Sequence, residues 1–220
     1  KSIRSYKNFL IALNINVSGT AKPRFLQWSV SSDTGAIPST WTASATNDAG
    51  DVDLAEANSP IVDGMTLRDS FIIYTEDSTH RMDYVGGDQV FRFQKILGMS
   101  GLMNINCAVE FDGWHFVVTG SDVIIHDGNS ANSVLDNQAR RDFFQSIDTN
   151  NRSKTFVFKN PFLNEIFIAY PSIGSSVCDK SLVYNYVTKT VSYRDLPNVN
   201  HAGYGTVSND LGSAWSADGD

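Results

Sequence analysis

The chain has 220 residues, of which 41% are hydrophobic, 19% charged and 11% aromatic. This composition is sufficient for a sizeable core and excludes a coiled coil or a charged disordered tail. The formal net charge of −7 predicts solubility and argues against a surface that grips nucleic acid or an anionic membrane, since both need clustered Lys and Arg.

Short runs rich in Val, Ile, Phe, Tyr and Thr, bounded by Gly, Asn, Asp or Pro, recur along the chain and predict β-strands. Some runs, such as Phe71–Tyr74 and Ile166–Ala169, are apolar at every position, which indicates a sheet covered on both faces. In chain order the predicted strands are Phe9–Asn14, Phe25–Val30, Phe71–Thr75, Arg81–Val85, Val90–Ile96, Ala108–Phe111, His115–Thr119, Val123–His126, Thr155–Phe158, Ile166–Tyr170, Leu182–Val187 and Thr190–Arg194.

One hairpin can be aligned residue by residue, and a second is expected further along the chain. Gly120 and Ser121 predict a tight turn of type II′, because glycine suits the first central position of this turn. The second turn is expected near Thr188 and Lys189. The predicted partners are Val118 with Val123, Val117 with Ile124, Phe116 with Ile125, His115 with His126, and Tyr186 and Val187 with Thr190 and Val191.

The predicted strands also repeat as a group. Strongly apolar strands centred at Ile72, Val117 and Phe167 lie about 45–50 residues apart, which is the period of a β-propeller blade of three or four strands. One blade cannot cover both of its faces, so it needs a neighbour on each side. Polar turns are expected before these strands at Asp63–Gly64, Asp112–Gly113 and Lys159–Pro161, and after the following strands at Gly86–Gly87, Asp127–Gly128 and Asp195 with Pro197.

The sequence therefore predicts an all-β fold in which residues 1–220 form a single β-propeller domain or a fragment of one. Trp28 and Trp215 begin similar segments about four periods apart, so we expect about four blades and the start of a fifth. The polar span Ser39–Ser59 is expected to be a loop between blades. Because the chain starts at Lys1 rather than Met, we expect a piece of a longer protein, and neither a signal peptide nor a membrane-spanning segment is predicted.

One short helix is predicted over Asp136–Ser146, between the third and fourth blades. Ser133 and Asp136 resemble a capping box in which Asp replaces Glu. Helical spacing places four apolar residues on one face and two arginines outward. These are Ala139, Phe143, Phe144 and Ile147, and Arg140 and Arg141.

The two cysteines, Cys107 and Cys178, are predicted to be free thiols, because a disulfide framework would use more cysteines in such a chain. Cys107 directly precedes an apolar strand, which predicts a buried thiol. No histidine is tied to it, so a nucleophilic role is not indicated.

His115 and His126 become direct cross-strand neighbours in the predicted hairpin, with both side chains on one face. Two imidazoles could be half of a metal site, with Asp112 or Asp127 nearby. A zinc site needs three or four protein ligands, and the sequence places no third one. We interpret the histidines as an ordinary polar pair and keep the metal site as the alternative.

The segment Ser31–Gly35 resembles the Asp-box turn of sialidases and related propellers, although the aromatic residue, Trp41, comes three residues late. In those families the box is a folding element away from catalysis, so the likeness concerns architecture only. A sialidase would also need three converging arginines and a Tyr–Glu nucleophile pair. The arginines here are scattered along the sequence: Arg4, Arg24, Arg68, Arg81, Arg92, Arg140, Arg141, Arg152 and Arg194.

The acidic residues do not single out a site. Glycoside hydrolysis needs two carboxyl groups about 5–9.5 Å apart, and the sequence cannot locate such a pair among Asp63, Asp69, Glu76, Asp77, Asp83, Glu110, Asp112 and Glu165. A calcium loop of Asp51, Asp53, Asp63 and Asp69 departs from the EF-hand spacing. We therefore assign no catalytic, cofactor-binding or metal residue, predict no cofactor, and do not expect an enzyme.

Four stretches resemble a family of tailed-phage and prophage virion proteins: Asp63–Tyr74, Gly120–Gly128, Phe156–Glu165 and Leu182–Tyr186. The likeness spans most of the chain and implies a structural protein of the tail or the head–tail connection, where β-propellers serve as modules. It carries no catalytic motif to transfer.

The resemblance implies that function lies in surfaces. The expected partners are other virion subunits, in a ring-shaped homo-oligomer where head-to-tail contacts close, with no direct grip on nucleic acid and no membrane segment. The expected location is the virion, after synthesis in the bacterial host cytoplasm. The loops Ser39–Ser59 and Asp136–Arg152 are the expected contact regions. A carbohydrate-binding or sialidase-like propeller is the alternative, supported by the Asp-box likeness and the aromatic content.

Overall fold

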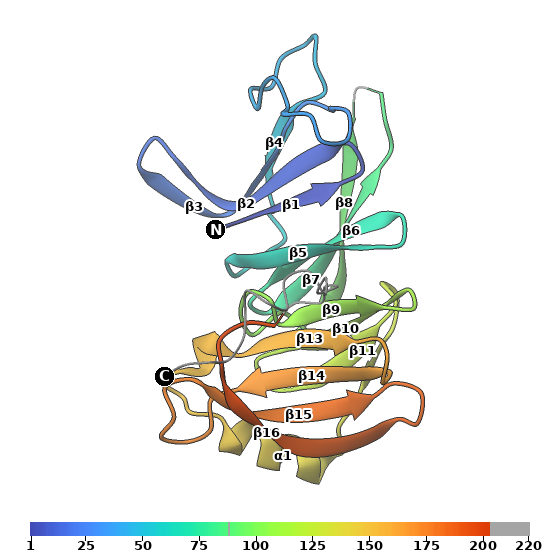
Figure 1. Cartoon of the computed structure of the whole chain (residues 1–220). Helices are drawn as coiled ribbons and strands as arrows, with labels where there is room; N and C mark the ends of the chain where they lie inside the picture. Colours follow the sequence, from blue (N-terminus) through green and yellow to red (C-terminus); the bar gives the residue numbers. More distant parts are fainter. Residues whose placement is uncertain (88, 203–220) are drawn as a thin grey trace, which may run out of the picture.

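The computed structural model describes residues 1–87 and 89–202, and within them the chain forms sixteen β-strands, one α-helix and one 3₁₀-helix, Arg152–Lys154. The strands make four antiparallel sheets of four strands each, and each sheet is a continuous stretch of the chain (Figure 1). The predicted all-β class is confirmed. The expected start of a fifth unit at Trp215 lies outside the described residues.

In every sheet the strands are neighbours in chain order, so each sheet is an up-and-down meander. The first sheet contains β1 (Ser2–Tyr6), β2 (Phe9–Val17), β3 (Thr20–Trp28) and β4 (Gly50–Asp53), and the second contains β5 (Ile61–Leu67), β6 (Ser70–Thr75), β7 (Ser78–Tyr84) and β8 (Phe91–Gly98). The third contains β9 (Ala108–Phe111), β10 (Trp114–Val118), β11 (Val123–His126) and β12 (Ala131–Ser133), and the fourth contains β13 (Phe156–Asn160), β14 (Glu165–Tyr170), β15 (Cys178–Asn185) and β16 (Thr190–Val199).

Adjacent sheets contact each other through their first strands. β5 contacts β1 and β2, β9 contacts β5, and β13 contacts β9. The second sheet is sandwiched between its neighbours: Phe71 and Ile73 pack in a core with the first sheet, while Ile72 and Tyr74 pack in a core with the third. All four side chains are buried, which confirms the prediction that this apolar run is covered on both faces.

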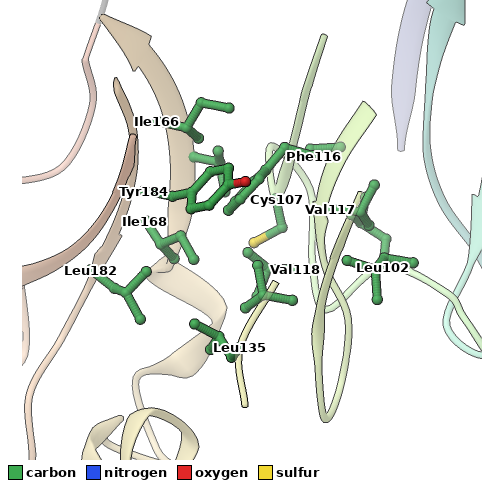
Figure 2. Packing of buried hydrophobic residues seen from close by; sticks show 14 of the residues in the cluster. Leu102, Cys107, Phe116, Val117, Val118, Leu135, Ile166, Ile168, Leu182 and Tyr184 are labelled. Carbon is green, nitrogen blue, oxygen red and sulfur yellow. The ribbon is translucent and has the colours of Figure 1, made fainter. Parts of the chain in front are cut away.

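The larger core joins the second, third and fourth sheets. Figure 2 shows the part of it that lies between the third and fourth sheets. The rings of Phe116 on β10 and Tyr184 on β15 stack with centroids 5.7 Å apart, across the space between the third and fourth sheets. On the other face of the fourth sheet, Phe156, Ala169 and Cys178 form a separate small core. All six residues of β14 are buried, which confirms the prediction for its apolar run Ile166–Ala169 and includes the charged Glu165 at its start.

Helix α1 (Asn137–Ser146) follows the third sheet and buries Phe143 in the larger core. The predicted helix is confirmed, but its predicted cap is not. Asp136 is the N-cap, and its carboxylate accepts hydrogen bonds from the backbone N–H groups of Gln138 and Ala139. Ser133 belongs instead to β12, where it pairs with Ile124 of β11, and its hydroxyl donates to the carboxylate of Asp122.

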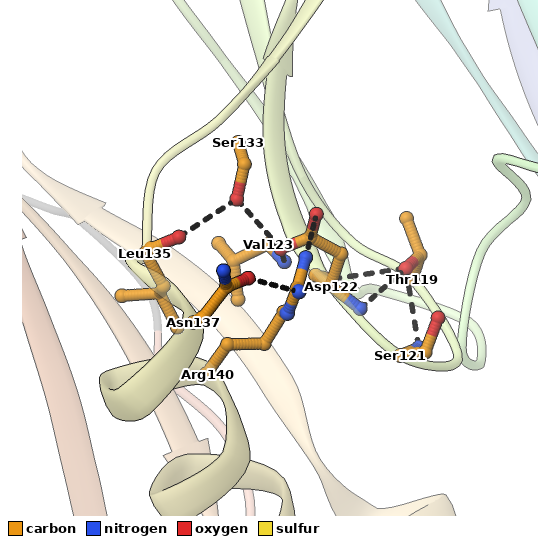
Figure 3. Close-up of polar contacts among 8 residues, drawn as sticks. All are labelled: Thr119, Ser121, Asp122, Val123, Ser133, Leu135, Asn137 and Arg140. Atoms are coloured by element: carbon orange, nitrogen blue, oxygen red, sulfur yellow. Dashed lines mark hydrogen bonds and ion pairs between the residues drawn. The ribbon is translucent and has the colours of Figure 1, made fainter.

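The β10–β11 hairpin has the predicted register, with His115 opposite His126. The prediction of a type II′ turn was wrong. This turn requires a positive φ at its first central residue, and φ of Gly120 lies outside the left-handed region. The Thr119 hydroxyl accepts hydrogen bonds from the N–H groups of Ser121 and Asp122 and shapes the turn in place of a glycine (Figure 3).

The same turn is tied to α1. The carboxylate of Asp122 accepts hydrogen bonds from the N–H of Val123 and the hydroxyl of Ser133, and it pairs with Arg140 at 3.1 Å (Figure 3). Arg140 therefore contacts the third sheet rather than facing freely outward, whereas Arg141 is exposed.

The second predicted hairpin register was wrong by two residues. Thr190 pairs with Asn185 and Val191 with Tyr184, so the connection is a longer loop. The side chain of Asn185 accepts hydrogen bonds from the N–H groups of Val187 and Thr188 within this loop, and thereby ends the strand early.

Four strands were not predicted: β1, β4, β5 and β12. Asp63 and Gly64 lie inside β5 at a register shift, so they do not form the expected turn. The span Ser39–Ser59 contains β4 and is therefore not simply a loop between units. Asp195 and Pro197 lie within β16 rather than ending it. The turns at Asp112–Gly113 and Asp127–Gly128 are present as predicted.

In the described part of the chain, no helix is both long and apolar enough to span a membrane.

The cap of α1 gives a first prediction. Asp136→Ala removes the acceptor of two backbone N–H groups, so we expect the free energy of unfolding to fall by about 0.5–2 kcal/mol. Urea denaturation followed by circular dichroism measures this change. Gln145→Ala, at an exposed position of the same helix, is the control and should have little effect. Equal stability of the two variants would show that Asp136 does not cap the helix.

Candidate functional site: a buried tyrosine–histidine cluster

A buried polar cluster lies between the second and third sheets. The Tyr74 hydroxyl on β6 is 2.6 Å from Nδ1 of His115 on β10 and 2.6 Å from Nε2 of His126 on β11. None of the three residues is more than 1% exposed. The hairpin register places the two imidazoles on one face, and the stacking of the sheets brings the tyrosine to them.

The other two ring nitrogens fix the direction of every hydrogen bond. Nε2 of His115 lies 2.9 Å from the carbonyl oxygen of Thr66, which can only accept, so this nitrogen carries the hydrogen. Nδ1 of His126 accepts a hydrogen bond from the N–H of Gly128 at 3.2 Å. Neutral His126 therefore donates from Nε2 to the Tyr74 oxygen, and Tyr74 donates to Nδ1 of His115.

The result is one directional chain of hydrogen bonds. It starts at the backbone N–H of Gly128, passes through His126, Tyr74 and His115, and ends at the backbone carbonyl of Thr66. Every donor and acceptor of the three rings is used once, as buried polar groups require.

Burial keeps the cluster uncharged. It lowers the pKa of His115 to about 4, and burial together with the neighbouring His115 lowers the pKa of His126 to about 4. Burial, and secondarily the charge of Asp63, raises the pKa of Tyr74 well above its ordinary value, so the phenol keeps its proton. The hydrogen-bond directions derived above belong to this neutral state.

For the alternative of a metal site at the two histidines, the described residues provide no third ligand. Asp127 accepts hydrogen bonds from the N–H groups of Asn129 and Ser130 in its own turn, and Asp112 lies in the β9–β10 turn. Residues 1–87 and 89–202 contain no group of three His, Cys, Asp or Glu side chains that could hold a metal ion. All four imidazole nitrogens are already bonded within the protein.

The arginines do not converge on one point among the described residues. Arg4, Arg140 and Arg194 each pair with a different carboxylate: Asp63, Asp122 and Glu165, respectively. Arg81 and Arg92 share Asp83, and Arg24 pairs with Asp53. Within the described residues, no carboxylate is paired with three arginines, as a sialidase would require.

The acidic residues considered for hydrolysis or calcium binding come from several different strands and turns. Asp63 is buried and accepts two hydrogen bonds from the guanidinium of Arg4, which joins β1 to β5. Asp51 and Asp53 lie on β4, while Asp69 lies in the β5–β6 turn. Each of the remaining carboxylates considered for hydrolysis is assigned to a turn or a strand: Glu76 and Asp77 to the β6–β7 turn, Asp83 to β7, Glu110 to β9, Asp112 to the β9–β10 turn and Glu165 to β14.

Both cysteines are free, as predicted, and the predicted burial of Cys107 is confirmed; Cys178 is buried as well. Burial raises the pKa of Cys107 to about 12 and that of Cys178 to about 11. The thiol of Cys107 donates to the carbonyl of Thr155, so it helps to join the third sheet to the fourth. The Asp-box-like segment Ser31–Gly35 lies in the long connection between β3 and β4.

Sequence reasoning found the histidine pair but missed Tyr74 and Thr66. The register of a hairpin depends on local turn chemistry, whereas the approach of β6 depends on how two sheets stack. The available signal was a tyrosine inside an otherwise apolar buried run, since a buried phenol requires a hydrogen-bond partner. No protein-family model matches the chain, and a search of curated proteins found no match.

Removing the central hydroxyl tests the directional chain. Tyr74→Phe leaves Nδ1 of His115 and the Nε2–H of His126 without their partner, so we expect a loss of about 1–3 kcal/mol in the free energy of unfolding. Chemical denaturation at pH 7.5 measures it. Tyr193→Phe removes an exposed hydroxyl and is the matched control. A Tyr74→Phe protein as stable as the control would show that the proposed series of hydrogen bonds through Tyr74 does not form.

The lowered histidine pKa values also predict a pH dependence. Above pH 6.5 both the folded and the unfolded states hold neutral histidines, and between pH 6.5 and about 4 only the unfolded state gains protons. Stability should therefore fall over this window, by about 1 kcal/mol per pH unit for each histidine. His80, whose pKa is also lowered by burial, adds to the same trend.

Denaturation curves from pH 7.5 to pH 4.5 measure this effect. The double variant His115→Gln, His126→Gln retains His80 and should show a shallower dependence. An equally steep dependence in the double variant would show that the cluster does not cause the loss.

Proposed function

We propose that this chain is a non-enzymatic structural module with a β-propeller arrangement, which works in a phage virion at the tail or the head–tail junction through contacts with neighbouring subunits. The observation that carries the non-enzymatic part is the sealing of the Tyr74–His115–His126 cluster. These residue types suit proton transfer, but backbone groups occupy both ends of their hydrogen-bond chain. No ring nitrogen is left for a substrate.

The arrangement of the sheets supports the propeller part of the proposal. Each sheet is a four-stranded meander, and adjacent sheets meet at their first strands, as blades do. Within the described residues the series β1, β5, β9 and β13 does not return to β1 through comparable contacts. Closure into a ring of blades would require further chain or a second subunit, which fits a protein that functions in an assembly.

The charges of the first strands support a surface that does not grip DNA. Each of these strands carries one charged residue, Arg4, Asp63, Glu110 or Lys159. Arg4 is paired with Asp63, and Lys159 donates to the backbone carbonyl of Glu110. The two signs are balanced, so this strand row lacks the basic lining that binds DNA by releasing counterions.

Ordered surface loops are the proposed contacts to other subunits. The β3–β4 connection is exposed over most of its length, yet it is held by internal bonds: the hydroxyl of Ser31 and the indole of Trp28 both donate to Asp48. A loop fixed in this way presents a defined shape without an ordering cost on binding. Head-to-tail contacts through such loops would close a ring-shaped homo-oligomer.

Particle composition tests the proposal. In the bacterium that carries the gene, we expect the chain to copurify with DNA-containing particles at a constant ratio to the capsid protein, measured by quantitative mass spectrometry of density-gradient fractions. Deletion of the gene should give particles whose heads and tails fail to join or whose tails are incomplete. A chain that remains in the soluble lysate, with infectious particles formed in its absence, would refute the virion assignment.

Fluorogenic glycosides provide a separate check on the non-enzymatic part. The purified chain should give no turnover above that of a heat-inactivated sample. Turnover that tracks with the folded chain would contradict it, whatever the particle experiment shows.

A further inference from the structure

We propose that the cleft between the third and fourth sheets is a binding site for a short saccharide, with preference for one that carries a carboxylate. The cleft has a volume of about 490 Å³ and is lined by residues of the β9–β10 and β11–β12 regions on one side and of the β15–β16 region on the other. This volume lies in the range of small-molecule sites. The proposal does not depend on the virion assignment.

Aromatic side chains form the walls of the cleft. Phe111 and Trp114 come from the third sheet, and Tyr184 and Tyr186 come from the fourth sheet and its following turn. The rings of Phe111 and Tyr186 lie 5.1 Å apart, and the Tyr186 hydroxyl is bonded to Asn164 at 3.1 Å, which fixes that ring. Rigid aromatic faces of this kind suit the apolar C–H face of a sugar ring.

Polar groups of the same cleft are left without partners inside the protein. Tyr184 is only 6% exposed, and its pKa is raised by burial. Within the described residues its hydroxyl makes no hydrogen bond and can therefore bond to a ligand in the cleft. The indole N–H of Trp114 and the amide of Asn132 also lack side-chain hydrogen bonds there. A ligand with several hydroxyl groups would satisfy these donors and acceptors.

Charge favours a neutral or acidic ligand over a basic one. Lys189 lines the cleft and forms no ion pair within the described residues, and the lining contains no carboxylate. The chain as a whole is acidic, with a formal net charge of −7. The ammonium group of Lys189 therefore makes the cleft favourable for an anionic ligand group. The carboxylate of a uronic or sialic acid would be such a group.

A glycan array of neutral, uronic and sialylated oligosaccharides, followed by titration calorimetry with the best ligand, tests the site. We expect Trp114→Ala to weaken binding by about tenfold or more through the loss of a stacking face, and Tyr184→Phe by about threefold to tenfold through the loss of one hydrogen bond. Lys189→Ala should weaken binding of acidic sugars and leave neutral ones nearly unchanged.

The controls are Tyr193→Phe and Lys95→Ala, which remove a hydroxyl and an ammonium group outside the cleft, and both should bind like the parent chain. Circular dichroism verifies that each variant is folded. If Trp114→Ala does not fold, Tyr184→Phe and Lys189→Ala still decide the question, because they are smaller changes. Absence of any saccharide binding at millimolar concentration, or binding that none of the cleft variants alters, would overturn the proposal.

Discussion

The need to bury both faces of each central strand determines the arrangement of this molecule. In β6 and β14 successive residues point to opposite faces and are nevertheless almost all apolar and buried. A single four-stranded sheet could cover only one of these faces. The chain meets the requirement by stacking four such sheets in chain order, so that the second sheet packs between the first and the third. The stability of each sheet is therefore coupled to the presence of its neighbours.

Apolar burial alone would hold the sheets together without fixing their relative position. Polar contacts across the sheet boundaries supply that precision, because hydrogen bonds tolerate little displacement. The Tyr74 hydroxyl must meet His115 and His126 at once, which allows one position of β6 over the β10–β11 hairpin. Arg4 adds a second fixed point, since its guanidinium bonds both Asp63 and Asn106 and so links the first three sheets.

Local patterns in the sequence predicted most strands, the helix and the register of the β10–β11 hairpin, because each depends on residues close together in the chain. β1, β4 and β12 were missed because they are short and largely polar. β5 was missed because Asp63 and Gly64 have the composition of a turn. In the structure Gly64 instead allows the ring of Phe71 to lie where a side chain would be, 2.6 Å from the position of an added Cβ.

The residues of the candidate site likewise differ in how far local sequence patterns could predict them. His115 and His126 follow from hairpin geometry, whereas Tyr74 is separated from them by 41 and 52 residues and meets them only after the sheets have stacked. The type of the β10–β11 turn could not be predicted from the sequence pattern either. The turn is shaped by the Thr119 hydroxyl, which accepts two backbone hydrogen bonds, and not by a positive φ at a glycine.

The stacking constraint also determines where a ligand can be accommodated. Sheets that meet at their first strands and twist will separate toward their outer strands, leaving a wedge-shaped space. Between the third and fourth sheets, α1 fills part of this wedge by inserting Phe143 into the larger core. The part next to Trp114 and Tyr184 receives no such insertion from the described chain and remains a cleft. The faces of the central strands are committed to packing, so we expect recognition at these wedges and at the loops that border them.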